Sequence, residues 1–395
     1  MVIRHAPGQF TLPAIIAGLV AVLVSYTSSA AIVFQAAQSA GASTEQIGGW
    51  LMILGLAMGV TSIGLSLRYR IPVLTAWSTP GAVVLIAGFH GITLNEAVGV
   101  FIFSNALILL SAVTGLFARM MRIIPQTICA AMLAGILLRF GLHAFTGLQQ
   151  NVLLCGSMCL AFVVGRQRIP RYAILLTLLV GLTVALAQHA VHAPAQPLRF
   201  VLPDFIAPHF SLSALAGVGI PFFIVTMASQ NAPGIAALQA AGYQPPVSSL
   251  IGWTGFTALL LSPWGGFSVC IAAITAAICM SDEVHADRQR RYTAAVAAGL
   301  FYLIAGALGG AVGLLFSALP DVLIQTLAGL ALLATLASSI QQALAEDDKR
   351  DAAMIAFLVT ASGIQLLGIG APLWGLIAGL LTCTVQRLLK KRKTS

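Results

Sequence analysis

Apolar runs of about 20 residues recur from one end of this chain to the other, and each is long enough to cross a membrane as a helix. Hydrophobic residues make up 59% of the 395 residues, and charged residues only 8%. A soluble globular protein carries about 25% charged residues. The sequence therefore predicts an all-α polytopic membrane protein. Its net charge of +9 does not indicate nucleic acid as a partner, because the basic residues lie in short loops and at the C-terminus.

Two of the apolar runs are poorly suited to a continuous helix. Residues 70–88 contain Pro72 and Pro80, with a stretch between them that reads as extended chain. Only the part after Pro80 is a clean helical run, about half a bilayer long. Residues 261–279 repeat this design, with a Pro–Trp–Gly–Gly break before a short apolar helix. Matched broken spans in two halves of a chain indicate a transporter's binding site.

The spans divide into two similar halves. The chain reads as fourteen spans, with a proline-rich link at residues 187–211 between the seventh and the eighth. Residues 24–41 align with residues 225–242 without gaps, and the shared residues include polar ones. Because seven is odd, the second half would enter from the opposite side, giving a 7+7 inverted repeat. We expect residues 1–200 to form the first seven-span repeat and residues 201–395 the second.

Lysine and arginine residues predict the orientation. With the N- and C-termini in the cytoplasm, all but two of the 20 basic residues fall in cytoplasmic loops or termini. Arg199 is the exception on the outside, and Arg139 lies in or near the fifth span. One span more or fewer would reverse every later loop, so this agreement also supports the count.

The two breaks predict an anion site. Each interrupted span leaves backbone N–H groups unpaired at the start of its short helix, and inverted symmetry would bring both helix N-termini together. Together they carry about one positive charge, which suits a single carboxylate. The candidate ligands are Ser78, Thr79 and the Gly81 amide at one end, with Gly265, Gly266, Phe267 and Ser268 at the other. The alternative is that the prolines only kink two packed helices.

Polar residues in the first and eighth spans extend this site. Hydroxyl groups in membrane helices often bond back to their own helix or join helices. Primary amides are costlier in an apolar environment, which favours a substrate or interhelical role for Gln230 and Asn231. From these spans we predict substrate-binding roles for Ser25, Tyr26, Ser28, Gln230 and Asn231. Aromatic residues beside the breaks could form flat walls for an aromatic substrate, or could be ordinary packing; they are Tyr26, Trp77, Trp264 and Phe267.

Missing residue types also carry information. All 11 acidic residues lie in loops or at span ends, which favours an anionic or neutral substrate. His90 and His143 read as interfacial, and Arg139 is either a counter-ion or, as we favour, an interfacial residue. The six cysteines show no metal-ligand spacing, so we predict neither a metal nor a cofactor. No metalloprotease motif, carboxylate pair or Ser–His arrangement suggests an enzyme.

With these residues in view, the whole chain resembles the benzoate/proton symporter family. The segments that carry the resemblance are residues 72–82, 132–141, 227–243, 272–279 and 290–292. The family in turn is similar to uracil permeases and anion exchangers in architecture. The resemblance implies a core of spans 1–4 and 8–11, a gate of spans 5–7 and 12–14, and short strands before the half-helices of spans 3 and 10. The core would cover about residues 11–118 and 211–318, and the gate about residues 124–190 and 320–389.

The resemblance further implies proton-coupled import of benzoate across a bacterial inner membrane. Its partners would be a small anionic substrate, protons and membrane lipid, and apolar faces of the gate helices would suit a homodimer. The chain departs from the family where a His and an Asn would be expected after the Gly–Gly pair, because Phe267 and Cys270 stand there. Transport or channel conduction of another small anion, or of a nucleobase-like compound, therefore stays open as an alternative.

Overall fold

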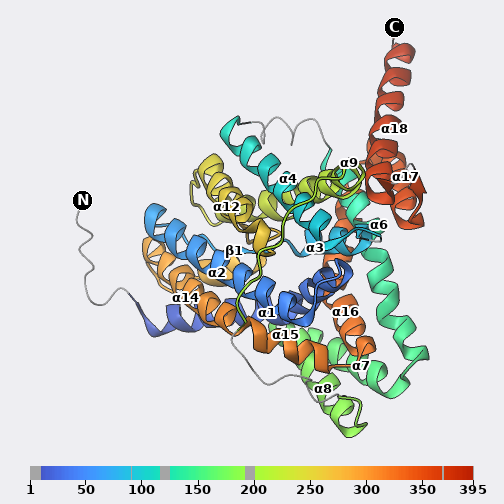
Figure 1. The fold of residues 1–395 in the computed structure, drawn as a ribbon. Helices are drawn as coiled ribbons and strands as arrows, with labels where there is room; N and C mark the ends of the chain where they lie inside the picture. The colour runs from blue at the N-terminus through green and yellow to red at the C-terminus, as the bar shows by residue number, and fades with distance from the viewer. Residues whose placement is uncertain (1–9, 90, 116–124, 192–200, 367–368, 395) are drawn as a thin grey trace.

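The computed structural model describes residues 10–89, 91–115, 125–191, 201–366 and 369–394 (Figure 1). His90 and four of the 20 basic residues counted above lie outside the described part of the chain; the four are Arg4, Arg119, Arg122 and Arg199.

Six described helices are long and apolar enough to cross a membrane. They are α1 (Leu12–Ser39), α2 (Thr44–Tyr69), α4 (Leu94–Val113), α6 with its following turn (Gln126–Gln149), the rod Leu212–Ala240 and α16 (Asp321–Ala343). α14 (Tyr292–Ala307) and α15 (Gly309–Ala318) meet at a bend of 59° and would make a seventh span together. The shorter helices are α7 (Val152–Arg168), α8 (Ala173–Ala187), α12 (Val247–Leu261) and α17 (Arg350–Ser362). α18 (Ala371–Thr394) has 24 residues, and its apolar part is Ala371–Gln386.

The rod Leu212–Ala240 is not a uniform α-helix. It contains α9 (Leu212–Ala214), α10 (Ile220–Thr226) and α11 (Ala232–Ala240), separated by the π-helical turns Leu215–Gly219 and Met227–Asn231. Single π-helical turns inside α-helices are frequent at functional sites. The second turn, η4, carries Gln230 and Asn231.

Both broken spans contain the extended stretches that were expected. β1 (Thr75–Ala76) precedes α3 (Thr79–Gly88), and β2 (Cys270–Ile271) precedes α13 (Ile274–Met280). β1 and β2 pair antiparallel, with Thr75 opposite Ile271 and Ala76 opposite Cys270. A second, exposed hairpin joins β3 (Gln365–Leu366) to β4 (Ile369–Gly370) just before α18.

The expectation of a helix directly after the Gly–Gly pair is wrong. α13 begins only at Ile274, because Gly265 and Gly266 end the preceding helix instead of opening the next. The Gly265 N–H donates to the Ser262 carbonyl and the Gly266 N–H to the Leu261 carbonyl, both at 3.0 Å. With Gly265 at φ +90°, this is the Schellman arrangement that closes helix C-termini.

The helices pack in two groups. In the first, α2 lies against α14 and α15, α4 against α12, and α1 against α3, α13 and α14; Figure 1 shows α2 in blue beside α14 in orange. In the second, α6 packs on α16 and α17, α17 on α18, and α7 on α8. Small residues permit the closest contact in the first group, since a Cβ added at Gly55 would lie 2.5 Å from the Gly306 Cα.

The link between the halves is not helical over its described part. Residues 201–210 lie against the start of α2, the start of α4 and the turn after α12. The Ile206 N–H donates to the Pro263 carbonyl at 2.8 Å, and the His209 N–H donates to the Asn95 carbonyl at 2.9 Å. The Asn95 side chain in turn donates to the Ala207 carbonyl at 2.7 Å, so this strap is fixed to the start of α4.

Candidate functional site

The two broken spans meet at the strand pair. Besides the β1–β2 register, the Ala272 N–H donates to the Leu74 carbonyl at 2.9 Å. Leu74, Thr75, Cys270 and Ile271 are all fully buried. Segments nearly 200 positions apart in sequence are thus joined by backbone hydrogen bonds. The polar residues of both spans lie around this paired β1 and β2, the strand crossing.

Ser78 anchors the start of α3 at this crossing. Its hydroxyl caps the helix by accepting from the Gly81 N–H at 3.0 Å, and it also accepts from the Thr226 hydroxyl at 3.2 Å. The Ser78 N–H donates to the Ser268 hydroxyl oxygen at 2.8 Å. The structure therefore brings Ser78, Gly81 and Ser268 together, with the Gly81 amide already capped from within the protein.

Thr79, the first residue of α3, is different. It is half-buried, and its hydroxyl makes no hydrogen bond within the described part of the chain. It stands at a helix N-terminus, where partial positive charge favours an anion. Of the residues predicted at this helix end, Thr79 is the one that keeps a polar side chain available to a ligand.

The π-helical turn η4 packs against α3, β2 and the second-group helix α6. Asn231 is fully buried in this turn; its side-chain oxygen accepts from the Ile271 N–H at 3.0 Å, and its side-chain nitrogen contacts the Met227 sulfur at 3.3 Å. Asn231 thus holds β2 in place. The neighbouring Gln230 is half-buried, and its amide has no hydrogen bond to the described residues. Gln230 is therefore the free amide at the crossing.

In α1, Ser29 rather than Ser25 or Ser28 reaches the crossing. The Trp77 indole N–H donates to the Ser29 hydroxyl oxygen at 2.7 Å. Ser28 and Ser29 each donate to the Ser25 carbonyl, at 3.1 and 2.7 Å, as hydroxyl groups in apolar helices often do. Ser29 is one of the functional candidates that sequence reasoning did not select, although it lies in the polar cluster that was recognised.

Tyr26 and Trp77 form an aromatic pair beside β1. Their ring centroids are 4.9 Å apart at an interplanar angle of 66°, and the Tyr302 ring lies 6.1 Å from that of Tyr26. The Tyr26 hydroxyl is buried and has no hydrogen-bond partner in the described structure. A buried hydroxyl without a partner is costly, which favours water or a ligand beside it. Tyr302 carried no sequence signal, because an aromatic residue in an apolar helix is ordinary.

The other two aromatic residues considered for the same wall pack on different rings. The Trp264 ring packs on Phe205 of the strap at 5.4 Å. The Phe267 ring is fully buried, with Phe101 at 6.0 Å and Phe222 at 6.4 Å. The four rings therefore do not form one slot.

The backbone amides expected to bind a ligand after the second break are already used. The Gly265 and Gly266 amides close the preceding helix, and the Phe267 N–H donates to the Gly265 carbonyl at 2.8 Å. The Phe267 carbonyl accepts from the Asn105 side chain at 3.0 Å, and that amide also donates to the Ser262 hydroxyl at 3.1 Å. Asn105 was missed, although a primary amide inside an apolar run is a recognisable signal.

Charged and metal-ligating groups are sparse around the crossing. Among the residues described, no group of three or more His, Cys, Asp or Glu could hold a metal. The exposed Arg139 side chain donates to the Ala361 carbonyl at 3.3 Å, which joins α6 to α17 rather than reaching the strands. The crossing thus offers hydroxyl groups, an amide, a helix N-terminus and an aromatic pair, which together can bind an anion with an apolar body.

Two solved structures resemble this one across almost the whole chain at low sequence identity. The murine solute carrier Slc26a9, an anion transporter in the inward-facing state, matches with a TM-score of 0.63 at 12% identity, over 98% of this chain and 70% of that one. The transmembrane domain of the cyanobacterial bicarbonate transporter BicA matches with a TM-score of 0.60 at 13% identity, over 93% and 97%. These likenesses show an all-helical, multi-span membrane fold.

The sequence comparisons are closer. The family model described as benzoate membrane transport protein matches residues 8–385. The inner membrane protein YdcO of Escherichia coli K12 is 56% identical over 380 residues, covering 96% of this chain and 97% of that protein. The benzoate membrane transport protein of Acinetobacter baylyi is 39% identical over 373 residues, covering 94% and 95%. The chain therefore belongs to the benzoate membrane transport family, and it is a transporter rather than an enzyme.

Proposed function

We propose that this protein imports an aromatic carboxylate, with benzoate as the first substrate to test, together with protons. The family description and the name of the Acinetobacter relative support benzoate. The name of the E. coli relative supports a bacterial inner membrane as the location. The distribution of Lys and Arg supports cytoplasmic N- and C-termini.

One observation carries the substrate class. At the β1–β2 crossing, the Thr79 hydroxyl and the Gln230 amide have no hydrogen-bond partners among the described residues. Trp77, which packs on Tyr26, lies two residues before Thr79 in the chain. The turn η4, which carries Gln230, packs against α3. A carboxylate would accept hydrogen bonds from Thr79 and Gln230 at the N-terminus of α3. Its ring would pack on the aromatic pair.

We propose fourteen spans arranged as a 7+7 inverted repeat. Helix pairs recur with exchanged roles, since α2 on α14 corresponds to α12 on α4, and α7 on α8 corresponds to α17 on α18. The anchors of the two strands also correspond: Ser29 of the first span binds Trp77, and Asn231 of the eighth binds Ile271. The first repeat would span residues 1–200 and the second residues 201–395.

The two packing groups support a division into core and gate. The core would take residues 11–118 and 211–318, and the gate residues 124–190 and 320–389. Alternating access would move the core, with its strand crossing, against the gate helices α6 and α16. A homodimer through the apolar outer faces of the gate stays a prediction.

The packing at the crossing supports a state open to the cytoplasm. α3 packs on α6, whereas the repeat-related pair of α13 and α16 has no comparable packing among the described residues. Ile274, the first residue of α13, is 79% exposed. In the proposed orientation α13 is the cytoplasmic half of its span, so this face would line an opening toward the cytoplasm.

The test is uptake of radiolabelled benzoate into tight proteoliposomes with and without an inward proton gradient. Saturable uptake that the gradient drives and unlabelled benzoate competes supports symport. Flux that neither saturates nor responds to the proton gradient would indicate a channel. No uptake of benzoate, with uptake of another aromatic acid or small anion, would reassign the substrate and leave the fold unaffected.

A further inference from the structure

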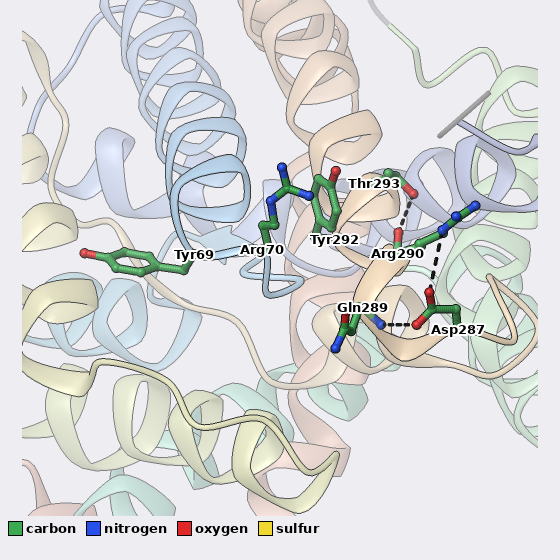
Figure 2. A pocket seen from close by; sticks show the side chains of 7 residues that line it. All are labelled: Tyr69, Arg70, Asp287, Gln289, Arg290, Tyr292 and Thr293. Atoms are coloured by element: carbon green, nitrogen blue, oxygen red, sulfur yellow. Dashed lines mark hydrogen bonds and ion pairs between the residues drawn. The ribbon is translucent and has the colours of Figure 1, made fainter. Parts of the chain in front are cut away.

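A polar pocket of about 470 Å³ lies away from the strand crossing, where the end of α2 meets the start of α14 (Figure 2). In the proposed orientation this is the cytoplasmic surface of the core. The residues that line it are Tyr69, Arg70, Asp287, Gln289, Arg290, Tyr292 and Thr293. None of them takes part in the substrate site described above.

Arg70 gives this pocket a cation that the protein does not neutralise. Its guanidinium lies 6.0 Å from the centroid of the Tyr292 ring, beside which Figure 2 shows it, and it forms no ion pair with any described carboxylate. Arg70 is also one of two described non-glycine residues with positive φ, at +53°. This left-handed conformation makes Arg70 the C-cap of α2, where its N–H donates to the Ser66 carbonyl at 2.9 Å.

The carboxylate in the pocket is committed to its own loop. Asp287 accepts from the Gln289 N–H at 2.9 Å and lies 3.6 Å from the Arg290 Nε. The residues that line the pocket therefore include two arginines and one carboxylate, which leaves a net positive charge. The 16-residue helix α14 also starts at this pocket, with Tyr292 and Thr293 as its first residues. The 3-10 turn Arg288–Arg290 leads into α14, and Asp287 caps this turn, so the partial positive charge of the helix start adds to that of the arginines beside the same carboxylate.

We propose that this pocket binds a phosphate group, supplied by an anionic phospholipid headgroup or by a soluble phosphate compound. Guanidinium groups match phosphate oxygens in geometry, and helix N-termini bind phosphate readily. Basic pockets on the cytoplasmic side of membrane proteins bind anionic headgroups. The proposal uses the inferred orientation but not the identity of the transported substrate.

The surface beside the pocket favours the lipid as the source. The Tyr69 hydroxyl is hydrogen-bonded to the Ser249 hydroxyl of α12 at 2.5 Å. From Ser249 one face of α12 continues through Trp253, Phe256 and Leu260, which are 56%, 46% and 58% exposed. Their spacing puts them on one side of the helix. Acyl chains could lie along this face while the headgroup phosphate enters the pocket.

Native mass spectrometry of the purified full-length protein tests the proposal. The detergent-solubilised protein would be titrated with phosphatidylglycerol, and in separate arms with inorganic phosphate and with ATP. The variants are Arg70→Gln and Arg290→Gln, and the control is Arg350→Gln, another arginine at a helix start, paired with Asp347. Melting temperatures would verify that all variants are folded.

We expect phosphatidylglycerol to bind and Arg70→Gln to weaken that binding about tenfold, as for loss of a charge-assisted contact. Competition by inorganic phosphate or ATP, lost in the same variant, would assign the pocket to a soluble phosphate instead. If each probe binds equally well to the wild type, to Arg70→Gln and to Arg350→Gln, the proposal is wrong. Because the readout is binding, a failure of benzoate transport would not affect it.

Discussion

The indole N–H of Trp77 donates to the hydroxyl oxygen of Ser29 at 2.7 Å, which ties the end of β1 to α1. In the other half, Asn231 ties β2 to the rod Leu212–Ala240 through the Ile271 N–H. Each broken span is therefore held by a polar residue from the span that begins its own half.

Gln230→Ala should weaken benzoate binding without unfolding the protein, because the amide has no partner among the described residues. A lost hydrogen bond to a charged group is worth about 1.5–3 kcal/mol, so the dissociation constant should rise roughly 10- to 100-fold. Isothermal titration with benzoate measures the change. Gln239→Ala, which removes an exposed amide of α11, is the matched control. Equal affinities in the two variants would remove Gln230 from the site.

Ser268→Ala should weaken benzoate binding indirectly, through α3. The change removes the acceptor of the Ser78 N–H and leaves a buried donor unpaired, a loss of about 1–3 kcal/mol. We expect a lower melting temperature together with weaker binding. Ser317→Ala, which removes an exposed hydroxyl that bonds back to its own helix, is the control and should change neither. Wild-type affinity of Ser268→Ala for benzoate would show that the Ser78–Ser268 hydrogen bond does not affect the site.

Trp77→Phe and Ser29→Ala should be strongly non-additive. Each removes the same indole–hydroxyl hydrogen bond, while phenylalanine keeps a ring to face Tyr26. A double-mutant cycle on the free energy of benzoate binding should therefore give a coupling of about 0.5–3 kcal/mol. A coupling near zero would mean that the bond has no effect on the site.

Gly265→Ala should destabilise the protein severely. The residue has φ +90°, and an added Cβ would lie 2.0 Å from the Trp50 ring. Gly41→Ala is the matched control for the backbone conformation, because Gly41 has φ +82° but nothing lies within 4 Å of the added Cβ. The control should lose only about 1–2 kcal/mol from the unfavourable backbone conformation. Similar melting temperatures for the two variants would show that the Trp50 contact is unimportant.

Ile274→Cys should react with a membrane-impermeant maleimide applied from the cytoplasmic side, in inside-out vesicles. The wild-type side chain is 79% exposed, whereas the control position Val83 in α3 is fully buried. Benzoate should slow labelling of the Ile274 variant. The wild-type protein, whose described cysteines are buried or half-buried, gives the background. Labelling only from the opposite side of the membrane would show that the site opens away from the cytoplasm, contrary to the proposal.

Local sequence patterns were enough to predict the membrane class and the positions of the two breaks. Prolines at 72 and 80 exclude a continuous helix, and β1 and α3 lie where the extended stretch and the short helix were expected. The polar residues Ser78, Gln230, Asn231 and Ser268 were also recognisable, because such groups are costly in an apolar span and need a reason to be there.

Which of these groups are left for a ligand depends on how distant segments pair in the folded protein. Ser78, Gly81 and Ser268 bind one another, Asn231 holds β2, and the amides of Gly265 and Gly266 close a helix, so Thr79 and Gln230 stay available. The partners of these groups lie up to about 200 residues away, and no local periodicity encodes such pairings. Hydrophobicity and backbone stereochemistry act along the chain, whereas hydrogen-bond satisfaction is settled between distant segments.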